Sequence, residues 1–480
     1  MKSGMARSIW RAGALALFSL WVLVGNIGVA RADVVAHLKR RIEHLLVAER
    51  LPYADVGIFA RVTDSGRILF ARNADTPFMP ASNFKILTTS TALAVLGPNF
   101  RYTTEIFGPP VDASGVIHGN LYLRGTGDPT MVEPWTEPAT GPFEHFADAL
   151  SKCGVRQITG ALVGDDIAFD RTFIGRGWLQ RYSMCDYAAE TSALSINGNV
   201  MYLDVRPNHV DAYPSSTALR IRRVFSGRGG CVVTRAMNHS TVLVQNLSPG
   251  HSVQASLTFH NPSLYTTGVF ARILAEHGIK TGRPMRLIGR GDLPLPKGMR
   301  CYAQHHSCRL IKILRQINKH SDNFFADHVF KTLGWREFGQ GTWKTGTRAV
   351  MNFLHHLGVD THGMQLADGC GLSVLNHVTP RQFVQVLEAM SKRPEGRLLK
   401  WTLPIAGVDG TLAGRLHGLP VVAKTGTIDG TCTLSGYLIT HAGQQVCFSI
   451  LVNHSRRSND EIRWLQDQIV RSMVSLSERV

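Results

Sequence analysis

A serine and a lysine stand three residues apart in Ser82-Asn83-Phe84-Lys85. If a helix begins near Ser82, this spacing places both side chains on one face. A serine hydroxyl alone is a poor nucleophile, but a lysine amine beside it can take its proton if burial and neighbouring charge keep the amine neutral. The pair therefore indicates nucleophilic catalysis by Ser82 with Lys85 as the base. The alternative is a serine that only caps the helix.

Ser321-Asp322-Asn323 begins another expected helix. A short hydroxyl and an amide there could pass a proton between a lysine, a leaving group and water, and the amide could hold a peptide carbonyl of the substrate. The alternative is again a helix cap, because Ser, Asp and Asn are all favoured at that position.

Lys424-Thr425-Gly426-Thr427 follows the apolar segment Leu419–Ala423. The pattern predicts an edge strand beside a cleft. The lysine offers a positive charge and the threonines offer hydroxyls to a substrate carboxylate, while Gly426 leaves room for a ligand backbone to approach. The alternative is an ordinary strand end.

The surrounding sequence predicts the elements that hold these three segments. Helical spacing of apolar residues marks Lys85–Leu96, closed by Gly97-Pro98. Short β-type runs separated by turn residues dominate from about 100 to 295. Further helices are expected at 308–317, 321–331, 345–357 and 380–390, followed by strands at 421–424, 432–439 and 446–453. A closing amphipathic helix, Asp460–Val474, is expected to pack on the final sheet rather than on a membrane.

The first 32 residues are typical of a secretory signal peptide. Basic residues precede an apolar run, and Ala30-Arg31-Ala32 offers small residues at the two positions that a signal peptidase recognises. An uncleaved anchor is the alternative, although the apolar run is short for a membrane span. No later stretch is long and apolar enough to cross a bilayer, so we expect at most peripheral membrane contact.

Composition and charge limit the possible partners. The chain is 44% hydrophobic and 18% charged, which excludes a disordered or fibrous protein. Its formal charge of +17 is scattered, without a long basic run or zinc-finger spacing, so we expect no nucleic-acid partner. An anionic envelope surface and solubility alone both explain the charge. The eight cysteines permit disulfides, but the sequence does not give their pairing.

The three segments, in this order on helix, helix and strand, match the motif set of penicillin-binding proteins and class A β-lactamases. The surrounding residues make the resemblance narrower. From about 50 to 455, the chain resembles the D-alanyl-D-alanine carboxypeptidase/endopeptidase family, the low-molecular-mass class C penicillin-binding proteins. The segments that carry this resemblance are Leu121–Met131 (LYLRGTGDPTM), Ser192–Asn199 (SALSINGN), Asn318–Asn323 (NKHSDN), Asp368–Ser373 (DGCGLS), Leu403–Gly410 (LPIAGVDG) and Ala423–Thr427 (AKTGT).

The resemblance implies an architecture. It is an α/β (α+β) fold with a β-lactamase/transpeptidase-like catalytic domain, in which helices flank an antiparallel sheet. The catalytic domain would comprise residues 33–99 and 296–480. Two inserted β-rich domains would occupy 100–295, the inner one at about 190–262.

The resemblance also implies an activity and a set of site residues. The enzyme would hydrolyse peptidoglycan peptides that end in D-Ala-D-Ala or are D,D-cross-linked, as a carboxypeptidase, an endopeptidase or both. It would work through an acyl-serine, bind β-lactams as covalent inhibitors, and act in the periplasm without metal or cofactor. The catalytic residues would be Ser82, Lys85, Ser321, Asn323 and Lys424, and the substrate-binding residues Thr425, Gly426 and Thr427.

Two departures from the family pattern affect the expectations. Cys370 stands where Ser is usual, and Val374 where Arg is usual. Cys370 is expected to be a packing residue, with a position near the cleft as the alternative. Tyr182 stands where the family often has an acidic residue, which leaves side-chain recognition of the substrate open. The competing functions are a β-lactamase and a non-catalytic wall-binding protein.

Overall fold

The structure is a computed structural model that describes residues 34–49, 55–206, 209–224, 232–236, 238–245 and 252–480. The expected signal peptide, residues 1–32, lies outside the described residues. The chain forms two compact units, which are described separately. The first contains the described residues up to Phe78 together with 378–388 and 404–480. The second contains residues 79–377 and 389–403.

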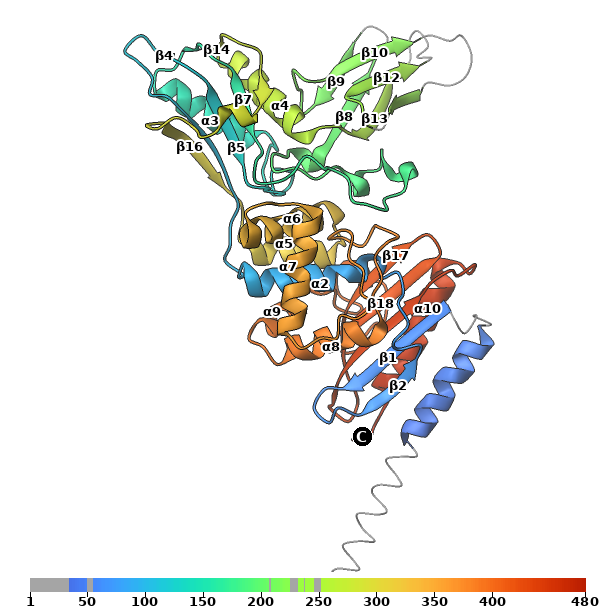
Figure 1. Cartoon of the computed structure of the whole chain (residues 1–480). Coiled ribbons are helices and arrows are strands. Elements are labelled where there is room, and N and C mark those ends of the chain that lie inside the picture. The colour runs from blue at the N-terminus through green and yellow to red at the C-terminus, as the bar shows by residue number, and fades with distance from the viewer. Residues whose placement is uncertain (1–33, 50–54, 207–208, 225–231, 237, 246–251) are drawn as a thin grey trace, which may run out of the picture. The chain divides into compact units, whose positions relative to one another are not determined.

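A five-stranded antiparallel sheet is the centre of the first unit, in the order β17-β18-β19-β1-β2. Segments distant in sequence meet in this sheet, because β1 pairs along its whole length with β19 (Figure 1). The strands are β1 (Val56–Val62), β2 (Ile68–Arg72), β17 (Val421–Ile428), β18 (Thr431–Ile439) and β19 (Gln445–Val452).

Two helices complete the core of the first unit. The helix at residues 34–48 and α10 (Asn459–Val474) bury apolar residues in one cluster with the sheet. Ser458 caps α10 by accepting the N–H of Glu461, whose carboxylate in turn accepts the N–H of Ser458. The expectation that the closing helix packs on the sheet is therefore confirmed. The short turn η7 (Gly410–Leu412) also lies in this unit.

The described residues of the second unit form four sheets. The largest has the order β15-β7-β5-β3-β16, with β3 antiparallel to β5 and β16 and with β7 parallel to β5 and β15. Its strands are β3 (Thr103–Gly108), β5 (Leu121–Gly125), β7 (Leu162–Asp165), β15 (Arg286–Leu287) and β16 (Arg300–His306). The other three sheets have three strands each. One is β14 (Lys280–Thr281), β6 (Gln157–Ile158) and β4 (Val116–Ile117), and the second is β13 (Val253–Thr258), β8 (Val200–Val205) and β9 (Val210–Tyr213). The third is β10 (Arg220–Val224), β12 (Thr241–Gln245) and β11 (Val232–Arg235). This confirms the β-rich texture, while the limits of the inserted domains remain a prediction.

Helices of the second unit form two groups. One group surrounds α2: α2 (Lys85–Val95), α5 (Leu310–Lys319), α6 (Asn323–Phe338), α7 (Trp343–His356) and α9 (Glu395–Thr402). In Figure 1, α2 in blue lies among the orange and gold helices from much later in the chain. The other group, α3 (Gly141–Lys152) and α4 (Pro262–Glu276), belongs to the β-rich segment. The remaining helix, α8 (Pro380–Ser391), runs through residues of both units.

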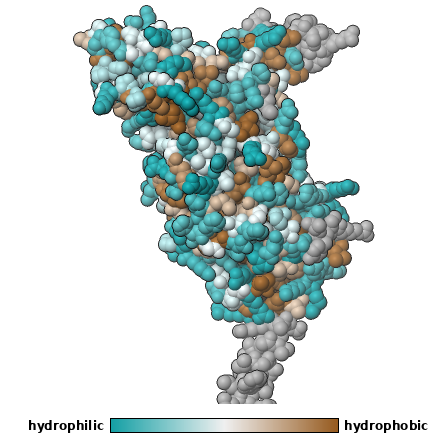
Figure 2. Space-filling view, viewed as in Figure 1, coloured by the Kyte–Doolittle hydropathy of each residue, from teal (hydrophilic) through white to brown (hydrophobic). Residues whose placement is uncertain are grey.

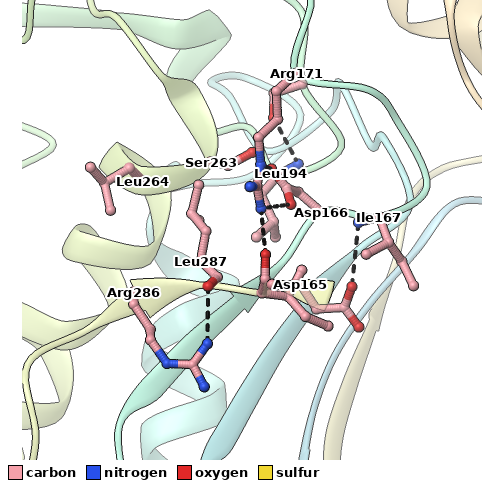
Figure 3. A network of polar contacts seen from close by, with 12 residues as sticks. Asp165, Asp166, Ile167, Arg171, Leu194, Ser263, Leu264, Arg286 and Leu287 are labelled. Atoms are coloured by element: carbon pink, nitrogen blue, oxygen red, sulfur yellow. Dashed lines mark hydrogen bonds and ion pairs between the residues drawn. The ribbon is translucent and has the colours of Figure 1, made fainter. Parts of the chain in front are cut away.

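Two aspartates at the end of β7 anchor the segment that follows. Arg171 holds Asp166 with two hydrogen bonds, Nε to Oδ2 at 3.0 Å and Nη2 to Oδ1 at 2.8 Å (Figure 3). The neighbouring Asp165 accepts Nε of Arg124 at 2.7 Å and the N–H of Ile167. Both carboxylates are buried, so these charge-assisted bonds fix the path of the chain toward the loop at 175–178.

Apolar residues on the face shown in Figure 2 lie in patches separated by polar ones. Among the residues that the structure describes, no helix combines the length and the apolarity needed to cross a membrane.

Candidate active site

Ser82 lies in a 3-10 turn, η2 (Ala81–Phe84), and α2 begins only at Lys85. We expected the helix to begin near Ser82. The turn runs directly into α2, and Ala81 at its start has a φ of 45°, a left-handed conformation that keeps a helix from extending to the N-terminal side of Ser82. Ser82 is partly exposed, as a nucleophile must be, whereas Lys85 behind it is fully buried.

Lys85 Nζ contacts three oxygen atoms. It lies 2.8 Å from Ser82 Oγ, 2.6 Å from Asn323 Oδ1 and 2.7 Å from the carbonyl oxygen of Cys370. An ammonium group would donate to all three. A neutral amine has two N–H bonds, which suit the amide and carbonyl oxygens, and its lone pair then faces the hydroxyl of Ser82. The geometry therefore suits an amine that accepts the serine proton.

The surroundings of Lys85 favour that neutral form. Burial lowers the pKa of Lys85 below the ordinary lysine value, although Cys370, Asp327 and Asp368 oppose the shift. Lys331 offers a contrast, because its buried Nζ lies 2.7 Å from a carboxylate oxygen of Asp170. The three hydrogen-bond partners of Lys85 are uncharged oxygens, so no direct ion pair with them holds its proton.

The loop at 368–373 presents the Cys370 carbonyl to Lys85. Asp368 shapes this loop by accepting four N–H bonds, from the backbones of Gly371 and Ser373 and from the side chains of Asn376 and Trp178, at 2.7 to 2.9 Å. Gly371 has a φ of 88°, and a Cβ atom there would collide with the carbonyl oxygen of Ala81. The loop can lie against the Ser82 turn only because this residue is glycine.

Asn323 links two parts of the site. Its Oδ1 accepts Lys85 Nζ, and its Nδ2 donates to the carbonyl oxygen of Tyr187 at 2.8 Å. Asp322 caps α6 by accepting the N–H of Phe325, so the capping alternative applies to Asp322. Ser321 precedes the helix with a φ of 60°. Ser321 and Asn323 both line a cavity of about 520 Å³, whose wall also includes Trp135 and Tyr187.

The third motif lies in the first unit, on the edge strand β17 as expected. Lys424 pairs with Ser435 across the ladder and is fully buried, with Nζ 2.7 Å from the carbonyl oxygen of Thr425. Side chains alternate along a strand, so Thr425 and Thr427 share the face opposite Lys424. Thr427 is exposed and Thr425 half-buried, which leaves their hydroxyls accessible at the edge.

Asp327, Asp368 and Cys370 are the one group in the described residues with the spacing of a metal site. However, Asp368 already accepts four N–H bonds, two on each oxygen. This use of its lone pairs fits a structural carboxylate better than a metal ligand. The seven described cysteines are all free thiols.

Two parts of the site were not predicted from the sequence, Asp327 and the Cys370 carbonyl. Asp327 is buried and accepts the N–H of Gly369 at 2.8 Å. It stands four residues after Asn323 on α6, a spacing that places both on one face and could have identified it. Cys370 is buried as a packing residue, yet its backbone belongs to the site.

Residues 38–473 match the D-Ala-D-Ala carboxypeptidase 3 (S13) family. This chain belongs to that family. It is a hydrolase, a penicillin-binding peptidase of the serine type, as the sequence indicated. Its relatives include a D-alanyl-D-alanine carboxypeptidase of an Actinomadura species, 30% identical over 449 residues that cover 87% of this chain and 81% of the relative. The D-alanyl-D-alanine carboxypeptidase DacB of Haemophilus influenzae is 29% identical over 434 residues, which cover 85% and 87% of the two chains.

Solved structures support the same assignment. Penicillin-binding protein 4 of Haemophilus influenzae matches 90% of this chain and 99% of its own, with a TM-score of 0.76 and 25% identity. That protein has also been solved as a complex with a β-lactam, and the structure of the complex matches this chain with a TM-score of 0.72. The expected fold class is confirmed.

Proposed function

We propose that Ser82 is the nucleophile and Lys85 the base in the hydrolysis of D-alanyl peptide bonds of bacterial cell-wall peptides. The observation that carries this proposal is the 2.8 Å separation of Lys85 Nζ and Ser82 Oγ, with Nζ fully buried among uncharged oxygens. A serine hydroxyl becomes a useful nucleophile when a positioned neutral base removes its proton.

The proposed reaction has two steps. Ser82 Oγ attacks the carbonyl carbon of the penultimate D-alanine while its proton passes to Lys85 Nζ. The peptide bond then breaks, the leaving amine takes a proton, and the acyl group remains as an ester on Ser82. In the second step water attacks the ester, which releases the shortened peptide and restores the serine hydroxyl. A β-lactam would acylate Ser82 in the same way.

The other predicted residues have supporting roles in this proposal. Ser321 would pass the proton to the leaving amine. Asn323, which already contacts Lys85, would also hold a peptide carbonyl of the substrate. Lys424 would assist the proton transfer to the leaving amine. Thr425 and Thr427 would bind the terminal carboxylate from strand β17, where Gly426 leaves room for the substrate backbone. These last assignments rest on family membership and on the half-buried Thr425 and the exposed Thr427 at the edge of the sheet.

The substrates would be wall peptides that end in D-Ala-D-Ala or are cross-linked through D,D bonds. Such peptides lie outside the cytoplasmic membrane, and the sequence at residues 1–32 predicts secretion into the periplasm. The 520 Å³ cavity beside Ser321 and Asn323 offers space for part of a bulky peptide.

Hydrolysis of defined wall peptides tests the proposal. The mature protein and a Ser82→Ala variant would each be incubated with a soluble peptide ending in D-Ala-D-Ala and with a D,D-cross-linked dimer. We expect the parent to release D-alanine from the first, to split the second, or both, and the variant to do neither. The ratio of the two rates would give the balance of carboxypeptidase and endopeptidase activity. Failure of the parent on both peptides would contradict the proposed substrate class.

A further inference from the structure

Behind Lys85 lies a buried acid that the reaction as described does not use. Asp327 is fully buried on α6, and its Oδ1 accepts the N–H of Gly369 at 2.8 Å. Its Oδ2 is buried and has no hydrogen-bond partner within the described part of the chain. An unpartnered buried carboxylate oxygen is costly when charged, so this carboxyl group favours the protonated state.

The neighbouring carboxylate of Asp368 also favours a proton on Asp327. One carboxylate oxygen each of Asp327 and Asp368 and the sulfur of Cys370 lie within 4.8 Å of one another. The four N–H bonds to Asp368 stabilise its ionised form, and two buried carboxylates this close resist being charged together. The proton therefore belongs on Asp327. Burial and the charge of Asp368 raise the pKa of Asp327 well above the ordinary value.

The loop connects this acid pair to the base. Gly369 donates to Asp327, and the adjacent Cys370 carbonyl accepts Lys85 Nζ at 2.7 Å. The ionisable groups around Asp327 are Asp368 and Cys370 on the loop, Lys85 on α2, and Lys331 on α6. An ionised Asp327 would attract a proton to Lys85 and so remove the lone pair that Ser82 needs.

We propose that Asp327 is a positioning residue for Lys85, and that its carboxyl group retains a proton so that Lys85 is available as a neutral amine. The inference rests on the proposed role of Lys85 as the base. Asp327 does not touch the substrate in this account. It orders the 368–373 loop through Gly369, and by remaining uncharged it leaves Lys85 without a buried counter-ion.

Acylation by benzylpenicillin, followed as a function of pH, tests this inference. The rate of adduct formation would be measured by intact mass from about pH 5 to about pH 10. In the parent, Asp327 keeps its proton while Lys85 loses one, so the acid limb should follow a one-proton curve. A limb broader than a one-proton curve would show that both groups titrate together, and it would overturn the inference without need of any variant.

The Asp327→Asn variant gives the second readout. Its amide oxygen can still accept the Gly369 N–H, but it cannot ionise. The carboxyl group that it replaces is already uncharged, so the half-maximal point should stay within about 0.3 pH unit of the parent. A shift of about 0.5 unit or more to lower pH, about threefold in rate on the acid limb, would show that Asp327 is charged in the parent and would overturn the inference. Asp327→Ala, which removes the acceptor of the Gly369 N–H, should lower the rate at every pH, so a rate restored in the Asn variant identifies the positioning role.

Asp128→Asn is the matched control. Asp128 is also fully buried, and burial raises its pKa to about 6, but it is not among the groups whose charge acts on Lys85. Its profile should coincide with that of the parent. A midpoint that moves to lower pH in Asp327→Asn, with the parent reactive, contradicts this inference alone. A parent that forms no adduct at any pH contradicts the proposed function as well.

Discussion

Two buried lysines on neighbouring helices have different hydrogen-bond partners. Lys331 Nζ donates to a carboxylate oxygen of Asp170 and to the Thr172 carbonyl, at 2.7 and 2.8 Å. Lys85 Nζ is surrounded by a hydroxyl, an amide and a carbonyl oxygen. Burial lowers the pKa of both lysines, but the carboxylate of Asp170 stabilises a positive charge on Lys331 more strongly than uncharged oxygens do on Lys85. At the scale of residues, this difference distinguishes a structural cation from a base.

Replacement of each lysine by methionine should separate these roles. Lys85→Met should lower the rate of penicillin acylation by about 100-fold or more, because the hydroxyl of Ser82 loses its base. Lys331→Met should leave the acylation rate of the folded protein within a few-fold of the parent. It should lower the free energy of unfolding by about 2 to 3 kcal/mol, because charge-assisted hydrogen bonds are lost. Acylation kinetics measure the rates, and thermal unfolding measures the stabilities. Equal acylation rates in the two variants would contradict the assignment of Lys85 as the base.

The Lys85 pKa also sets the direction of pH dependence. Burial lowers this pKa, so the amine is neutral at a lower pH than an ordinary lysine, and activity should fall as the pH falls through the lowered value. The acid limb of the rate of D-alanine release from a wall peptide measures this titration. A rate that rises continuously as the medium becomes more acidic would contradict a neutral Lys85 as the base.

The sequence predicted the Ser82–Lys85 pair because their three-residue spacing is local. It could not predict that the third partner of Lys85 would be a backbone carbonyl, since every residue has one and only the fold selects Cys370. Asp327 was missed for a related reason. Its function depends on Gly369 and Asp368, which lie about forty residues further along the chain and meet it only after folding.

At the scale of elements, glycine determines how closely the 368–373 loop approaches the nucleophile. Gly371→Ala would introduce a Cβ atom into the Ala81 carbonyl at a backbone φ of 88°. We expect the variant to be destabilised by about 1 to 3 kcal/mol and to acylate more slowly, because the loop carries the Cys370 carbonyl.

Gly358→Ala is the control for this prediction. Gly358 has a φ of 71°, but a Cβ atom there would meet no atom within 4 Å. It should cost about 1 kcal/mol of stability and leave the acylation rate unchanged. Chemical denaturation and adduct kinetics measure the two effects. A Gly371→Ala protein that acylates as fast as Gly358→Ala would show that the loop has no part in the reaction.

Elements with strong apolar periodicity were predicted well. The helices α5, α7, α8 and α10 lie within a few residues of the expected ranges, whereas α6, which is buried along most of its length, continues beyond Lys331 to Phe338. The strand β16 and the helix α9 were not predicted. β16 (RCYAQHH) has few apolar residues and is held in place by its pairing with β3, a contact distant in sequence. Its β structure is therefore set by the tertiary fold rather than by local preference.

At the scale of the whole molecule, the order of the three motifs along the chain led to the correct fold class, and the family match covers residues 38–473. The resemblance was needed for this, because the sequence between the motifs gives short strands without a distinctive period. The limits of the inserted domains, at 100 and 295, remain a prediction. Because these sheets join segments that are far apart in the chain, no local sequence pattern marks where a domain begins or ends.

Export provides a prediction at this scale. If residues 1–32 are a signal peptide, the mature protein recovered from outside the cytoplasm should begin at Asp33. The N-terminal peptide identified by mass spectrometry measures this directly. Substitution of Ala30 and Ala32 by large residues should block cleavage, because a signal peptidase requires small side chains there. A mature protein that retains the apolar segment would instead indicate an anchor.

The most direct test of the central claim is the intact mass of the mature protein after reaction with benzylpenicillin, beside the Ser82→Ala variant. Our account predicts a stable adduct of one penicillin on the parent and none on the variant, because the ester forms on Ser82 Oγ. An adduct on both proteins would place the nucleophile elsewhere. Intact drug and an unmodified parent would contradict the active site described here, and complete hydrolysis of the drug without an adduct would indicate a β-lactamase.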